Sequence, residues 1–216
     1  MNIKYRPDID GLRAIAVIFV ILFHSQISLF GIQLFKGGFI GVDIFFVISG
    51  YLITSILFKE LYLKKKINFY YFYQRRIRRL IPALLVVMIF STLIASIYLP
   101  PSRFVEFSKS ILYSLGFSSN FFFYFSGLNY FEFEGLFLPF LHTWSLSVEE
   151  QYYILFPVLL FIVFNYGKKN LFIILIFIFL ISFFLAEFGS RNLQNGTFYF
   201  LHSRMWELLA GSILAY

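Results

Sequence analysis

The chain has 216 residues, of which 60% are hydrophobic, 23% aromatic and only 13% charged, and its formal net charge is +7. This composition excludes an ordinary soluble domain. The absence of cysteine excludes a disulfide framework and a thiolate metal site. The excess lysines and arginines lie in short stretches between apolar windows, which is typical of membrane topology and does not favour nucleic-acid binding.

The apolar windows approach the roughly 20 residues that a helix needs to cross a bilayer. They predict an all-α fold, a polytopic integral-membrane bundle of about six or seven transmembrane helices. In chain order the windows are Leu12–Phe30, Gly38–Phe58, Ile81–Leu99, Phe104–Phe125, Val148–Tyr166, Leu171–Leu185 and Phe198–Tyr216.

The first window follows the basic residues Lys4, Arg6 and Arg13, and no small-residue cleavage site comes after it. We therefore expect a retained first helix and not a signal peptide. The most positive block of the chain runs from Lys59 to Arg79, between the second and third windows. The positive-inside rule places this loop in the cytoplasm, and two crossings back place the N-terminus there too.

The fourth window, Phe104–Phe125, contains Glu106, Lys109 and Asn120 and leaves two alternatives open. If the window crosses the bilayer, Lys168 and Lys169 fall outside the cell. If it forms an interfacial or re-entrant segment, they fall in the cytoplasm, as the positive-inside rule prefers. We favour the crossing.

His24 lies inside the first window, eleven residues after Arg13. At 100° per residue the two share one helix face and lie roughly 16 Å apart along its axis. An ionisable group deep in a bilayer suggests function, with a histidine hydrogen-bonded inside the bundle as the alternative. Asp10 lies within side-chain reach of Arg13, so those two also fit a simple charge pair at the helix start. Asp43 needs a partner too, either Arg13 or His24, or it belongs to a structural ion pair.

Glycines in the second window predict close helix packing. Gly37 and Gly41 are four residues apart and would let a neighbouring helix approach closely. Asp43 and Gly50 are seven residues apart and fall on one face of the same helix.

The arginine run comprises Arg75, Arg76, Arg78 and Arg79. Arg75, Arg78 and Arg79 would share a face of a helix. Such a cluster can hold phosphate or pyrophosphate through bidentate contacts. The alternative is that the arginines only set the topology and touch anionic membrane lipid.

A further group of polar and aromatic residues, His142, Trp144 and Glu149, stands where the chain enters the membrane. Ser147 with Glu150 fits a capping box that opens a helix. That structural role leaves the other three residues as candidates for function.

In the last window Arg204 and Glu207 are three residues apart and can neutralise one another, with Trp206 between them. The chain contains no zinc pattern, P-loop, nucleophile elbow or dinucleotide fingerprint, so we expect no metal.

In this order the segments resemble acyltransferase family 3, the OafA-type integral-membrane O-acetyltransferases. The resemblance extends from Tyr5 to Ala215. The closest likeness is to members that often carry an additional extracytoplasmic SGNH-type hydrolase domain. The stretches that carry it are YRPDIDGLRAIAVIFVILFH, GGFIGVDIFFVISGYLIT, FYQRRIRRLIP, LHTWSLSVEEQYYILFP and SRMWELLAGSILA.

The resemblance implies a multi-pass enzyme of the bacterial inner membrane. It would transfer an acyl group, usually acetyl, from cytoplasmic acetyl-CoA to a hydroxyl of an extracytoplasmic glycan. Lipopolysaccharide O-antigen, exopolysaccharide and peptidoglycan are such acceptors. The family's arginine–histidine pair falls on Arg13 and His24, and its arginine motif falls most simply on Arg76 and Arg79. Other motif positions are Asp10, His142, Trp144, Arg204, Trp206 and Glu207.

We expect His24 to act as general base or as transient acyl carrier, with Arg13 and Asp43 to orient it or balance its charge. Glu149 completes the expected catalytic set, and the arginine run would hold the phosphates of the donor.

Family members have more spans than this chain, which stops at Tyr216 inside an apolar window. We therefore expect residues 1–216 to form an incomplete acyltransferase membrane domain that lacks later helices and any SGNH-type domain. Two alternatives to an active enzyme are a truncated, inactive scaffold and a transporter-like protein with a buried proton relay.

Overall fold

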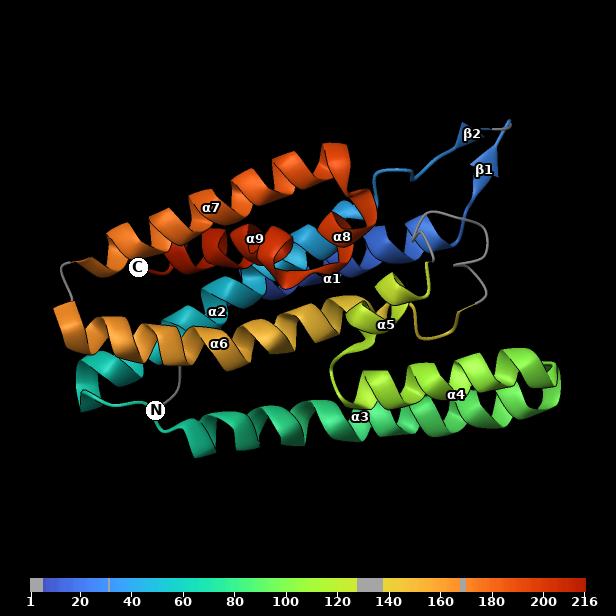
Figure 1. The fold of residues 1–216 in the computed structure, drawn as a ribbon, viewed down its shortest axis with the longest axis horizontal. Helices are drawn as coiled ribbons and strands as arrows, with labels where there is room; N and C mark the ends of the chain where they lie inside the picture. The colour runs from blue at the N-terminus through green and yellow to red at the C-terminus, as the bar shows by residue number, and fades with distance from the viewer. Residues whose placement is uncertain (1–5, 31, 128–137, 168–169) are drawn as a thin grey trace.

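The computed structural model describes residues 6–30, 32–127, 138–167 and 170–216 (Figure 1). It confirms the all-α membrane bundle. The helices are α1 Pro7–His24, α2 Ile40–Lys64, α3 Phe69–Tyr98, α4 Pro101–Leu115, α5 Ser119–Phe125, α6 Thr143–Gly167, α7 Leu171–Asn192, α8 Gln194–Tyr199 and α9 Leu201–Leu214. Two short strands, β1 Ser28–Leu29 and β2 Ile32–Gln33, pair antiparallel between α1 and α2.

Within the described residues, four helices are long and apolar enough to cross a membrane: α2, α3, α6 and α7. The first predicted window is shorter than expected, because α1 ends at His24 and the β1–β2 hairpin follows. The last predicted window is divided between α8 and the 14-residue α9. The full number of about six or seven spans therefore stays a prediction.

The single crossing that we favoured for Phe104–Phe125 is wrong. The helix breaks between α4 and α5, where Phe117 adopts a left-handed φ of 49° and the Ser118 N–H donates to the Tyr113 carbonyl at 2.9 Å. Neither piece is long enough to cross, and α4 turns back along α3 (Figure 1). The last turn of α6 and the first turn of α7 consequently lie at the same end as the connection from α2 to α3. Lys168 and Lys169 themselves lie outside the described residues.

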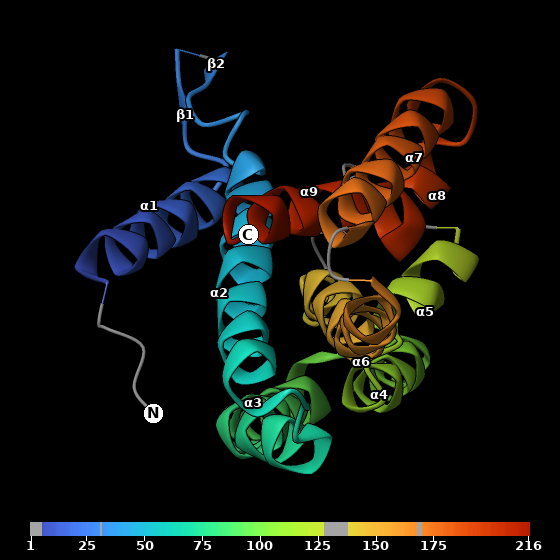
Figure 2. The ribbon, with the colours of Figure 1, turned by 90° about the vertical axis from the view of Figure 1, so that its left-hand side faces the viewer.

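The helices form two layers (Figure 2). One layer contains α1, α2, α9 and α7 side by side, and the other contains α6, α3 and α4. The main core lies between them and is rich in aromatic rings, including Phe46, Trp144, Tyr152 and Tyr153. Large apolar side chains on α1, α3 and α7 are exposed, which suits helices that face lipid.

Glycines allow α2 to pack closely against both α1 and α9. Gly38 and Gly41 lie against backbone carbonyls of α1, whereas a Cβ at Gly37 would meet only the side chain of Ile40 at 4.0 Å. The prediction that Gly41 allows a neighbouring helix to approach closely is therefore confirmed. The second glycine at this contact is Gly38 and not Gly37. Gly50 and Gly211 bring the backbones of α2 and α9 together in the same way.

We predict that Gly50→Ala destabilises the bundle by about 1–3 kcal/mol, because the added methyl would meet the backbone carbonyl of Leu208, which cannot rotate away. Thermal unfolding in detergent micelles would measure the loss. Gly11→Ala is the control, since nothing lies within 4 Å of that position. Equal melting temperatures for the two variants would contradict the close packing of α2 on α9.

Candidate functional site

A cavity of about 590 Å³ lies between α1, α2, α3 and α6. It brings together residues that the sequence singled out in three separate segments, namely Arg13, Arg75, Arg76, Arg79 and Glu149. Two further polar residues line it that the sequence analysis missed, Ser49 and Tyr153. The rest of the wall is apolar and comes mainly from α2.

The arginine run faces this cavity because α3 begins just before it. Asn68 caps the helix, and its side-chain oxygen accepts the Tyr71 N–H at 3.0 Å. Helical spacing then turns Arg75 and Arg79 to one side, one turn apart. Arg78, which we predicted on the same face as Arg75 and Arg79, does not line the cavity.

Arg76 is already engaged with the protein. It donates to the Glu150 carboxylate from Nη2 at 2.6 Å and from Nε at 3.2 Å. Its guanidinium carbon lies 3.5 Å from the ring centre of Tyr153. The predicted capping box is therefore wrong: α6 begins at Thr143, Ser147 lies within the helix, and Glu150 pairs with α3 instead.

The other arginines of the cavity have weaker partners. Arg13 makes the expected ion pair with Asp10, but at 4.0 Å. The Arg75 guanidinium lies over the Tyr71 ring at 4.5 Å. Arg79 makes no hydrogen bond or ion pair with any residue that the structure describes. Three cationic groups thus remain available to an anion in one cavity.

Glu149 is the one carboxylate among the described residues that line the cavity. Its Oε1 atom accepts hydrogen bonds from the hydroxyls of Ser49, at 2.5 Å, and of Tyr153. Tyr153 follows Glu149 by one helical turn, so the spacing could have revealed this contact. Ser49 lies 100 residues earlier in the chain, and no sequence pattern pairs it with Glu149.

A second charged cluster joins α2 to α9. Arg204 pairs with Glu207 at 2.7 Å, as predicted, and with Asp43 at 3.0 Å. The expectation that Asp43 pairs with Arg13 or His24 is therefore wrong. Helix α2 presents this carboxylate to α9 and not to α1. The alternative of a structural ion pair is the one that the geometry favours.

Aromatic rings surround this second cluster. The Arg204 guanidinium carbon lies 5.5 Å from the ring centres of Trp144 and Phe198 and 5.8 Å from that of Phe46. Trp144 is 1% exposed and belongs to the core. Trp206 instead packs on phenylalanines of α7. None of these residues lines the arginine cavity.

His24 is the last residue of α1, exposed, with Nδ1 2.8 Å from the Val20 carbonyl oxygen. Its predicted place in the middle of a span is therefore wrong, and it does not line the cavity. It lies close enough to His142, in the turn before α6, for their charges to repel. The protein atoms packed around the ring and this repulsion both lower the pKa of His142.

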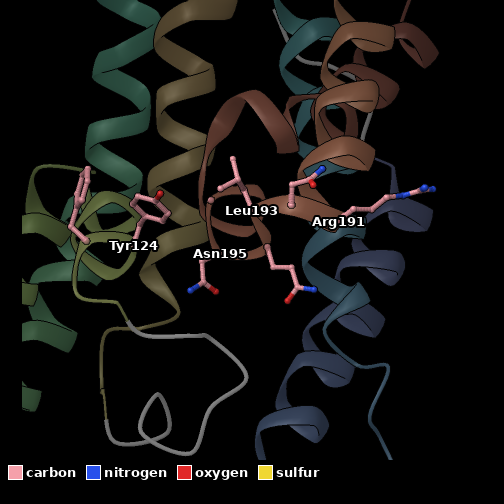
Figure 3. A pocket seen from close by; sticks show the side chains of 8 residues that line it. Tyr124, Arg191, Leu193 and Asn195 are labelled. Atoms are coloured by element: carbon pink, nitrogen blue, oxygen red, sulfur yellow. The ribbon is translucent and has the colours of Figure 1, made fainter.

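A second hollow, of about 660 Å³, lies where α5 meets the corner between α7 and α8 (Figure 3). Its side chains include Tyr124, Leu193 and Asn195, while Arg191 points away from Tyr124. No residue selected from the sequence lines it. In the part of the chain that the structure describes, no three acidic or histidine side chains gather where they could hold a metal ion.

The family model described as an acyltransferase domain matches residues 6–216 of the chain. O-acetyltransferase OatA of Staphylococcus aureus strain NCTC 8325 is 37% identical over 99% of the chain. A protein of strain MSSA476 with the provisional name O-acetyltransferase SAS0844 is 40% identical over the whole chain. The chain spans 35% of the length of each relative. No solved structure matches the chain.

The Arg204 cluster gives a prediction for stability. Arg204→Met leaves the buried Glu207 carboxylate and the partly buried Asp43 carboxylate without their cation, which costs about 3–5 kcal/mol and should prevent stable folding. Adding Asp43→Asn and Glu207→Gln to that variant should restore the fold, because no charge then lacks a partner. Size-exclusion chromatography and thermal unfolding in detergent would measure both. Arg191→Met is the control, since its ion pair with Glu187 is exposed. Normal folding of Arg204→Met alone would refute the structural role.

The histidine pair gives a prediction for pH dependence. Because the charge of His24 lowers the pKa of His142, His24→Gln should raise that pKa toward its ordinary value. Diethylpyrocarbonate reacts with an imidazole only in its neutral form. The modification of His142, followed by mass spectrometry against pH, should therefore have a higher midpoint in the variant. His202→Gln serves as the control. An unchanged midpoint in His24→Gln would show that the two rings do not interact.

Proposed function

The chain belongs to the acyltransferase domain family, and on this premise we propose that it is a membrane enzyme that transfers an acyl group to a glycan hydroxyl. The donor would be cytoplasmic acetyl-CoA. The acceptor would be a cell-surface glycan such as lipopolysaccharide O-antigen, exopolysaccharide or peptidoglycan. The names of the two S. aureus relatives support O-acetylation as the reaction.

The observation that carries this proposal is the cavity with three available arginines. CoA is a polyanion with a pyrophosphate and a 3′-phosphate, and guanidinium groups bind phosphates through paired hydrogen bonds. Arg13, Arg75 and Arg79 would hold this anion. Arg76 would shape the site through its ion pair with Glu150. The thioester supplies its own driving force, so the reaction gives no reason to expect ATP or a metal.

The positive block from Lys59 to Arg79 suggests how the protein lies in the bacterial inner membrane. The connection from α2 to α3 and the N-terminus would face the cytoplasm, where acetyl-CoA is made. The end with the β1–β2 hairpin would face the outside, where the glycan is.

The remaining candidate residues then divide by position. His24 and His142 would act at the outer end, with His24 as general base toward the acceptor hydroxyl. Glu149 would accept a proton inside the cavity. Asp43 would support the site by joining α2 to α9, because its carboxylate is bound to Arg204.

We predict that Arg79→Gln raises the KM for acetyl-CoA about tenfold or more and changes kcat less, because a charge-assisted hydrogen bond of about 1.5–3 kcal/mol is lost. Release of CoA by membrane vesicles that carry the acceptor glycan would measure both constants. Arg78→Gln is the matched control, since Arg78 lies one position away and outside the cavity.

Equal effects of the two substitutions would contradict an anion site in the cavity. Flux of a solute without consumption of acetyl-CoA would instead support the transporter-like alternative.

A further inference from the structure

We propose that Ser49 is the first acceptor of the acyl group, with Glu149 as its general base. The inference rests on the proposed acyl transfer and adds a covalent step to it. The acyl group would pass from the thioester to the Ser49 hydroxyl inside the cavity and from there toward the glycan.

The geometry of Ser49 is that of a nucleophile beside its base. Its Oγ atom donates to Glu149 Oε1 at 2.5 Å. A hydroxyl becomes a useful nucleophile when an adjacent base can take its proton at such a distance. Ser49 is only 6% exposed, yet it lines the cavity that the arginines share. The hydroxyl is thus shielded from water but open to a bound donor.

Glu149 is itself oriented by its surroundings. The Tyr153 hydroxyl donates to the same carboxylate oxygen from one turn further along α6. The Arg76 guanidinium stacks on the Tyr153 ring and pairs with Glu150, which holds this part of α6 against α3. Nucleophile, base and orienting group therefore come from two helices, α2 and α6, with α3 as their support.

Other hydroxyl groups of α2 have structural partners. Thr54 donates to Ser212 of α9 at 2.7 Å, and Ser55 donates to the carbonyl of Tyr51 at 2.8 Å. Neither lines the cavity. Ser49 is the α2 hydroxyl that both lines the cavity and touches a carboxylate.

The position of His24 also favours a relay. The sequence suggested His24 as acyl carrier, but it lies at the end of α1, roughly 16 Å along the axis from Arg13, and outside the cavity. If the thioester lies in the cavity beside Ser49, a group other than His24 must act on it.

The step balances with the residues and substrates named. Ser49 Oγ attacks the carbonyl carbon while its proton moves to Glu149. The carbon–sulfur bond breaks, and CoA leaves as the thiol with the proton from Glu149. The acyl ester of Ser49 then meets an acceptor hydroxyl, which attacks the ester carbonyl as Ser49 regains a proton.

The test is acyl labelling of the chain in membrane vesicles with [14C]acetyl-CoA and no glycan. We expect label on the Ser49 peptide by mass spectrometry. In a second assay, free CoA that carries its own label should exchange into unlabelled acetyl-CoA. Ser49→Ala should reduce both to background. Ser49→Cys should carry a label that neutral hydroxylamine removes, because a thioester is labile where a serine ester is not. A serine that only positions Glu149 would not show this change of chemistry.

Ser55→Ala is the matched control on the same helix and should keep both signals. Exchange that persists in Ser49→Ala, or label on Tyr153 or His24, would overturn the inference. So would glycan acetylation by the unmodified chain without any exchange, since transfer would then be direct. Failure of the unmodified chain to consume acetyl-CoA in the presence of glycan would refute the proposed function itself.

Discussion

The ion pair between Arg76 and Glu150 is the interaction on which the site depends. Apart from its packing on α4, α3 reaches the bundle mainly through long side chains, and this largely buried pair, 2.6 Å long, is the ion pair among those links. Removing one partner of a buried pair leaves an uncompensated charge, which costs several kcal/mol. Tyr73 adds a hydrogen bond to the Tyr153 carbonyl at 3.2 Å. These contacts place α3 at a distance from α2 that leaves a cavity between them, and they turn the neighbouring arginines toward it.

Much of the fold could be predicted because its causes are local. An apolar window long enough to cross a bilayer indicates a helix wherever it lies, and α2, α3, α6 and α7 follow from that alone. The pair of Arg204 with Glu207 could be predicted for the same reason, since side chains three residues apart on a helix lie close together. The arginine run could be recognised as a possible anion site, because the charges are adjacent in the chain.

The errors have two physical origins, which are local turns of the backbone that hydropathy does not show and neighbours that lie far away in the sequence. The apolar stretch after His24 reads as more helix, but the chain turns into a hairpin there. The break at Phe117 is invisible to a hydropathy window, since one residue with a left-handed backbone ends α4. The partner of Asp43 depends on α9 packing beside α2, and that packing follows from glycines whose contacts no pattern reveals. The contact of Ser49 with Glu149 spans 100 residues and is equally hidden.

The separation between the cavity and the histidine pair has a consequence for any reaction that this bundle performs. The arginines, Ser49 and Glu149 lie together between four helices, whereas His24 and His142 lie at the end with the hairpin. One catalytic group cannot act at both places, so different residues along the axis of the bundle must act on the donor and on the acceptor. A thioester held beside Ser49 and an acceptor approached from the outer end would require the acyl group to move between them. A buried hydroxyl beside a carboxylate is chemically suited to hold that group on the way.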